Sequence, residues 1–325
     1  MPKFNQLAVL LTVSMLLAAV VVLAQFPPPM RQHTATKKQE LQLVLADQQL
    51  PARNEVAITE EDGFRVIRVN SIPEHKVGRF PNRGNPHRVE QISTAFRVPL
   101  MPRSNDEPYP IRLGLNFGVA VNGILFDPSA AEFWQGNPRL GWQYEALGGA
   151  VPLGLDENYA HVQPSGKYHY HGLPSGLLGD LHFDPEAHSP LVGWAADGFP
   201  IYARFGYSDP QDPKSAIVEL HSSYRLKQGD RPAPPDGPGG AYDGAFLNDY
   251  ELVARSGDLD ECNGRTCVTP EFPAGTYAYF LTSEWPVIPR QFRGTPDPSF
   301  QSGPGGPPGG PGRGPRPGPP PRGAR

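Results

Sequence analysis

Residues 51–300 are predicted to form one large, mainly β domain with long loops. Their apolar side chains gather in short runs that are rich in Val, Ile, Phe and Tyr and end at turn-forming residues, as strands do. No strongly amphipathic, proline-free segment of helix length stands out between these bounds. No internal repeat or change of composition divides them either, so one domain is the simpler organisation for a chain of 325 residues.

Several segments are predicted to be strands, and one to be a short helix. The strand runs are GFRVIRVNSIP (63–73), QISTAFRVPL (91–100), IRLGLNFGVAVNGILF (111–126), FPIYARFGY (199–207), YELV (250–253) and GTYAYFLT (275–282). Asn122-Gly123 between apolar flanks predicts a hairpin turn. The segment PSAAEFWQG (128–136) predicts a short helix with Ser129 as its N-cap.

The two ends of the chain differ from the body. Residues 1–24, in which Lys3 precedes the apolar run 7–23, are typical of a cleaved secretory signal; an uncleaved membrane anchor is the alternative. Residues 25–50 are proline- and glutamine-rich and indicate a linker. Residues 301–325 hold nine glycines and nine prolines and predict a disordered tail that contacts solvent or the cell envelope. The expected location is therefore secreted or periplasmic.

The charge balance gives no indication of nucleic-acid binding. Five of the 29 basic residues lie in the signal and the tail, so residues 25–300 carry 24 basic and 33 acidic side chains, a balance of −9. Nucleic-acid partners favour basic surfaces, and we therefore expect none.

The two cysteines, Cys262 and Cys267 in CNGRTC, are predicted to form a small disulfide that closes a tight Asn-Gly turn. An oxidising compartment favours this pairing over a metal pair, and the four-residue spacing excludes a thioredoxin-like dithiol.

Five of the nine histidines lie between residues 161 and 188, and two of them stand in SGKYHYHGLP (165–174). Successive side chains of a strand point to opposite faces, so His169 and His171 would share one face, and Tyr168 and Tyr170 the other. The turn residues 164–166 could fold His161 back as a third ligand. Imidazole groups in this pattern suit copper, zinc, nickel or iron.

Two other interpretations remain open. The Tyr-His alternation could be a packed aromatic wall in a structural envelope module. Alternatively, acids such as Asp197 and Asp260 could serve a secreted hydrolase that acts on a cell-wall or extracellular polymer, with aromatic rings as a sugar platform. Whether the protein is an enzyme does not follow from the sequence.

Several ordered stretches resemble the YHYH-domain family of exported bacterial proteins. They are VNSIPEHKVGRFPNRGNP, GVAVNGILFDP, WQYEALG, AHVQPSGKYHYHGLP, GWAADGFPIY, YDGAFLNDYE, LDECNGR and FRGTPDPSF, and they span about residues 55–300. The family is largely uncharacterised, so the resemblance implies membership more than an activity. This chain departs from it at Asn70-Ser71, where relatives have Asn-Gly, and at YAYFLT, where some relatives carry a second Tyr-His-rich stretch.

The resemblance adds His75, which stands in the family segment IPEH, as a candidate fourth ligand. The complete expectation is a metal site of His75, His161, His169 and His171. Its metal would be copper before zinc, because of the affinity order of divalent metals. Glu145 or Asp197 would accept hydrogen bonds from the imidazole rings. Tyr168 and Tyr170 would pack on the far face or serve as further hydrogen-bond partners behind the ligands.

Overall fold

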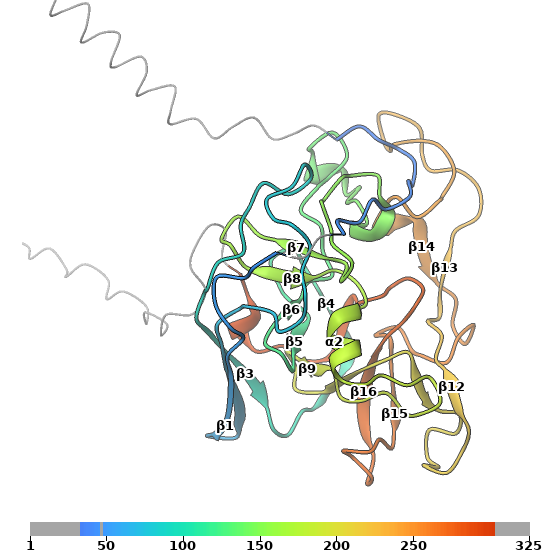
Figure 1. The fold of residues 1–325 in the computed structure, drawn as a ribbon. Coiled ribbons are helices and arrows are strands. Elements are labelled where there is room, and N and C mark those ends of the chain that lie inside the picture. Colours follow the sequence, from blue (N-terminus) through green and yellow to red (C-terminus); the bar gives the residue numbers. More distant parts are fainter. Residues whose placement is uncertain (1–32, 46–47, 303–325) are drawn as a thin grey trace, which may run out of the picture.

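The computed structural model describes residues 33–45 and 48–302, which form one mainly β domain (Figure 1). The signal expected at 1–24 and most of the tail expected at 301–325 lie outside these residues. No helix among the described residues is long and apolar enough to cross a membrane. The strands are β1 (Val56–Glu61), β2 (Phe64–Val69), β3 (Thr94–Pro99), β4 (Ser104–Pro110), β5 (Gly118–Ala120), β6 (Leu125–Phe126), β7 (Ala160–Val162), β8 (Tyr168–Tyr170), β9 (Gly193–Ala195), β10 (Pro200–Ala203), β11 (Phe205–Tyr207), β12 (Ile217–Glu219), β13 (Tyr224–Leu226), β14 (Tyr250–Leu252), β15 (Gly264–Cys267), β16 (Thr276–Leu281) and β17 (Gln291–Gly294).

The helices are short. They are the α-helix α2 (Ser175–Asp180) and the 3₁₀ turns η1 (Pro138–Leu140), η2 (Ala146–Gly148), η3 (Leu247–Asp249) and η4 (Pro298–Phe300). All six sequence runs expected as strands contain strands, so the mainly β prediction is confirmed.

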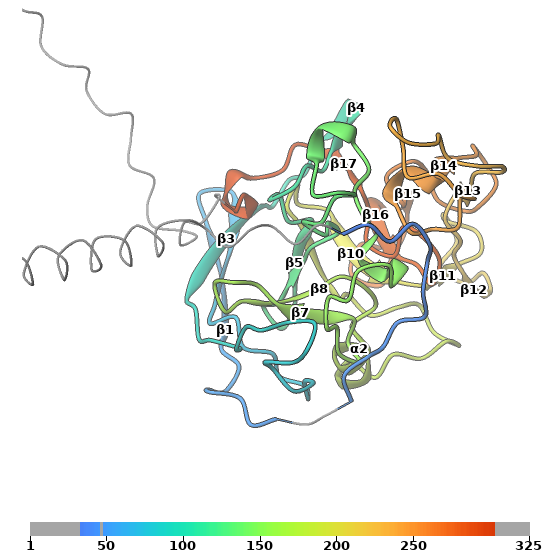
Figure 2. The ribbon, with the colours of Figure 1, turned by 90° about the horizontal axis from the view of Figure 1, so that it is seen from above.

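An eight-stranded mixed sheet forms the centre of the domain, in the order β15-β16-β10-β9-β5-β6-β8-β7. The Asn122-Gly123 hairpin is present: β5 pairs with β6 antiparallel, and Gly123 takes the positive φ of 83° that such a turn requires. β8 then pairs parallel with β6 and antiparallel with β7. Figures 1 and 2 show β7 and β8 side by side at the end of this sheet.

A three-stranded sheet, β1-β2-β3, packs its inner face onto the same core. In β3 the buried Thr94, Phe96 and Val98 alternate with more exposed residues, which is the pattern of a strand with one covered face. The largest cluster of buried residues lies around these side chains and those of the central strands. Two smaller clusters form around Tyr144 and Phe246 and around Tyr202 and Phe280.

Residues 33–45, which are part of the segment expected as a linker, lie extended against the domain (Figure 1, blue). Val44 bridges to Asp156, and the Lys38 amide donates to Asp243 Oδ2 at 2.9 Å. Leu41 and Leu43 pack against the cluster around Tyr144. This segment therefore contributes to the packing of the domain.

The prediction of a short helix at 128–136 is wrong, because the structure has no helix there. The segment instead pairs with residues 142–144, since the Trp134 amide donates to the Trp142 carbonyl and the Tyr144 amide donates to the Glu132 carbonyl. Gln135 and Gly136 turn the chain with positive φ values of 56° and 65°. Burial of Trp134, which is 4% exposed, outweighs the local helix preference of Ala130 and its neighbours.

Candidate metal site

A hairpin made by β7 and β8 positions the three histidines of the motif region. His161 lies opposite His169 in the antiparallel register. The turn at 164–166 that the sequence predicts is present: the Gln163 amide donates to the Lys167 carbonyl, and Gly166 has a φ of 91°. The hairpin thus returns His161 to His169, as expected.

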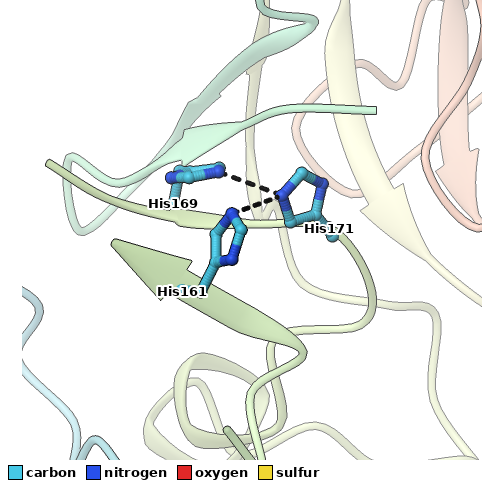
Figure 3. Close-up of side chains that lie close together, drawn as sticks. All are labelled: His161, His169 and His171. Carbon is cyan, nitrogen blue, oxygen red and sulfur yellow. Dashed lines mark hydrogen bonds between the residues drawn. The ribbon is translucent and has the colours of Figure 1, made fainter. Parts of the chain in front are cut away.

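The three imidazole rings converge on one point (Figure 3). The Nε2 atom of His171 lies 3.0 Å from Nε2 of His169 and 3.1 Å from Nε2 of His161. His169 and His171 are only 2% and 3% exposed, whereas His161 is half-buried. Nitrogen ligands about 2.05 Å from a tetrahedral metal lie about 3.3 Å apart, so this spacing is close to that of a three-histidine site.

Hydrogen bonds at the Nδ1 atoms of His161 and His169 determine that their Nε2 atoms face the point where the three rings converge. His161 Nδ1 lies 2.8 Å from the Leu153 carbonyl, and His169 Nδ1 lies 3.4 Å from the Lys167 carbonyl. A carbonyl accepts only from N–H, so each neutral ring carries its proton on Nδ1 and a lone pair on Nε2. Backbone carbonyls therefore orient two of the three candidate ligands.

Hydrogen bonding alone does not satisfy this arrangement. A single N–H on His171 Nε2 could align with only one of the two facing lone pairs. His171 Nδ1 is also buried, and it has no hydrogen-bond partner among the described residues. A cation bound at the centre would take up all three Nε2 lone pairs, so the residues present fit a metal ion.

Burial lowers the pKa of all three histidines, and the proximity of the other imidazoles lowers it further for His169 and His171. For these two the pKa falls well below the usual 6.5. The rings are therefore neutral near pH 7, which is the form that binds a metal.

Tyr168 and Tyr170 lie on the opposite face of β8, as the alternation predicts. The Tyr168 hydroxyl donates to Asp156 Oδ2 at 2.7 Å, and the Tyr170 hydroxyl lies 2.6 Å from His75 Nε2. His75 Nδ1 faces the Lys76 carbonyl at 2.8 Å. The structure therefore does not bring His75 to the other three histidines, because β8 separates them and both of its ring nitrogens have other partners.

Glu145 and Asp197 also lie away from the imidazole rings. The Glu145 carboxylate accepts from Trp285 Nε1 at 2.8 Å and pairs with Arg290 at 2.6 Å. Asp197 Oδ2 accepts from the Tyr279 hydroxyl and from a backbone amide. The expectation that either acid orients a ligand ring finds no contact in the structure, and backbone carbonyls take that role.

Sequence reasoning did not consider Asp127, which directly follows β6 and whose Oδ1 atom accepts from the Ser129 amide at 3.0 Å. β6 pairs with β8 so that Leu125 is opposite His169, and the Asp127 amide donates to the Tyr170 carbonyl. If the alternation of β6 continued for one residue beyond Phe126, Asp127 would lie on the side of His169 and His171. Burial raises the pKa of Asp127 to about 6. The alternation in GILFDP, read together with the hairpin, was the signal that could have found it.

The predicted disulfide is wrong, because Cys262 and Cys267 are both free and fully buried. Cys262 packs in the main cluster, whereas Cys267 packs beside Tyr202 and Phe280. The expected turn does not close, since Gly264 begins β15 and the extended strand carries Cys267 away from Cys262.

Comparison with known proteins identifies one related group. The family model described as YHYH protein matches residues 95–294, which is more than half of the chain and includes the three converging histidines. No curated protein and no solved structure matches the chain.

Proposed function

Since the chain belongs to the YHYH protein family and brings three imidazoles to one point, we propose that it is an exported protein that binds one transition-metal ion. His161, His169 and His171 would hold the ion through their Nε2 atoms. The observation that carries the proposal is the convergence of these atoms within 3.0–3.1 Å of His171 Nε2, with carbonyls behind two of the rings.

Copper is the first choice for this metal and zinc the second. All three candidate ligands are neutral imidazoles, which suit both metals, and copper has the higher affinity for a given nitrogen site. Export to an oxidising compartment would make Cu²⁺ the relevant ion. The apolar run at 7–23 followed by small residues supports export.

Three protein ligands would leave coordination positions open, as in sites that exchange ligands and unlike closed structural sites. A bound ion would supply Lewis-acid or one-electron chemistry at that position. The chain's own residues would orient the site, because the Leu153 and Lys167 carbonyls hold two of the rings. An ion would enter beside His161, the half-buried member of the group.

Elemental analysis tests the proposal directly. The full chain is exported in mixed-metal medium, purified without a histidine tag and compared with His169→Ala/His171→Ala. We expect near-stoichiometric copper or zinc in the unmodified protein and its loss in the double variant. His182→Asn is the matched control, because His182 is exposed and has a positive φ that Asn tolerates.

Because the double variant could fail to fold, His161→Gln provides a second measurement at a half-buried position. Near-ultraviolet circular dichroism checks its packing, and its metal content is expected to fall while that spectrum is kept. Unmodified protein that contains no copper or zinc, and whose melting temperature does not change when either ion is added, would refute the proposal. The Tyr-His alternation at residues 168–171 would then have a structural role only.

A further inference from the structure

A hollow lies beside the segment 283–287, and no residue of the three-histidine group lines it. Its volume is about 570 Å³, within the range of roughly 300–1,000 Å³ typical of small-molecule sites. Strands β13 and β14 contribute Tyr224 and Tyr250 to the wall, and the C-terminal part of the chain contributes Trp285.

Three aromatic rings make up much of this wall. Trp285 stacks on Tyr250 with ring centroids 4.1 Å apart and planes only 5° from parallel. Tyr224 meets Trp285 edge-on at 5.0 Å. All three residues are only partly buried, so the group presents aromatic surface to whatever occupies the hollow.

The charged groups around these rings are largely paired. Glu145, which is 4% exposed, is paired with Arg290, and Glu284 lies 3.1 Å from His221 Nδ1. Arg225 donates to the backbone carbonyls of Ser222, Tyr224 and Ser256. The lining thus holds both signs of charge in balance, together with hydroxyl groups such as that of Ser283.

From this lining we propose that the hollow binds a neutral saccharide. A sugar ring presents C–H faces that pack on aromatic rings. Its hydroxyls can accept from Lys38, and they can donate to carboxylates and to the Ser283 oxygen, whose own proton goes to Glu219. Because Glu145 and Glu284 have basic partners and the signs of charge balance, the lining favours neither an anionic nor a cationic ligand. A purely apolar ligand would strip water from the charged rim.

Calorimetric titration of the full chain with three neutral oligosaccharides, chitohexaose, cellohexaose and maltoheptaose, tests this site. We expect at least one of them to bind with a Kd below about 1 mM. Tyr250→Ala is expected to weaken that binding at least about tenfold. Tyr109→Ala is the matched control, because Tyr109 is an exposed aromatic residue that does not line the hollow, and it should bind as the unmodified chain does.

Trp285→Ala is a second variant, and unchanged melting of at least one of the two ring variants validates the comparison. The inference would be overturned if no neutral oligosaccharide binds, or if both ring variants bind as tightly as the unmodified chain. It would also be overturned if the Tyr109→Ala control loses binding to the same degree. Because the titration needs no metal, its result is separate from the fate of the metal proposal.

Discussion

At the scale of single residues, the four side chains of Tyr168–His171 divide by position into two roles. The odd-numbered imidazoles His169 and His171 face His161, and the even-numbered phenols are hydrogen-bonded within the core. The hydroxyl of Tyr170 reaches both Asn122 and His75, which explains why His75 is buried without joining the site.

Asp197 should make stability depend on pH in a defined direction. Burial raises the pKa of its carboxyl from 3.8 to about 6, so the folded state retains a proton that the unfolded state releases. The contribution of Asp197 to stability therefore falls as pH rises from about 4 to above 6. Relative to Asp197→Asn, the unmodified protein should lose about 2 kcal/mol between about pH 4.5 and about pH 7.5.

Urea unfolding of both proteins at the two pH values measures this difference. The metal-free form is used in both cases, so that ion binding does not contribute. A difference that stays constant, or that favours the unmodified protein at the higher pH, would show that Asp197 is not held in an unfavourable environment when ionised.

The sequence was sufficient to predict that three of the four candidate ligands lie together, because their relationship is local. Strand alternation fixes His169 against His171, and a turn of a few residues fixes His161 against both. His75, Glu145 and Asp197 are placed by contacts with residues far away in the sequence, such as Tyr170, Arg290 and Tyr279. Neither periodicity nor composition encodes such contacts.

At the scale of elements, the site depends on the turn between β7 and β8. Gly166 supplies the left-handed backbone that closes this turn, and a Cβ there would collide with the side chain of Glu90. Gly166→Ala should therefore destabilise the protein by about 1–3 kcal/mol and reduce its metal content, because the register of His161 is disturbed.

Thermal unfolding and elemental analysis of Gly166→Ala check this expectation. Gly136→Ala is the matched control, since Gly136 also has a positive φ but a Cβ there meets nothing within 4 Å. If both variants lose the same stability, backbone strain alone would account for the effect, and the contact with Glu90 would be irrelevant.

The element predictions differed in success for a physical reason. Strand runs such as 275–282 are both locally favourable and buried, so propensity and packing agree. In 128–136 the burial of Trp134 against residues of a neighbouring segment competes with helix formation and prevails. In 262–267 the extended β15 replaces the closed turn on which the disulfide prediction depended.

Thiol titration tests the corrected state of Cys262 and Cys267. Because both side chains are fully buried, we expect no reaction with a thiol reagent in the folded protein and two reactive thiols per chain after unfolding without reductant. The protein is purified under air from the exported fraction, because these conditions would oxidise the two thiols if they could pair. Fewer than two thiols after unfolding would indicate that an oxidised pair forms after all.

At the scale of the whole molecule, Arg231 connects the N-terminal segment to the body. Its buried guanidinium pairs with Asp249 and Asp243 at 2.5 Å and donates to the Thr36 carbonyl at 2.7 Å. Asp243 also accepts from the Lys38 amide. Arg231 thus joins Thr36 to Asp249, the buried carboxylate at the end of η3. Lys38 is joined to the same group through Asp243.

Arg231→Ala should lower the free energy of unfolding by about 3–5 kcal/mol, because it leaves the fully buried Asp249 without its counter-charge. Arg68→Ala is the control: it breaks an ion pair with Glu61 in which both side chains are about half exposed, and should cost less than about 1 kcal/mol. Urea unfolding measures both. Equal losses of unfolding free energy in Arg231→Ala and Arg68→Ala would contradict the role assigned to the buried Arg231–Asp249 pair.

The two-faced β8 strand has a consequence for the integrity of the fold. A slip of one residue against β6 and β7 would turn every side chain of the strand around, sending the phenols to the metal side and the imidazoles into the interior. Any molecule in which the three Nε2 atoms meet has therefore also seated Tyr168 and Tyr170 correctly. The fraction of molecules that hold a metal ion would therefore depend on correct folding as well as on the availability of the metal.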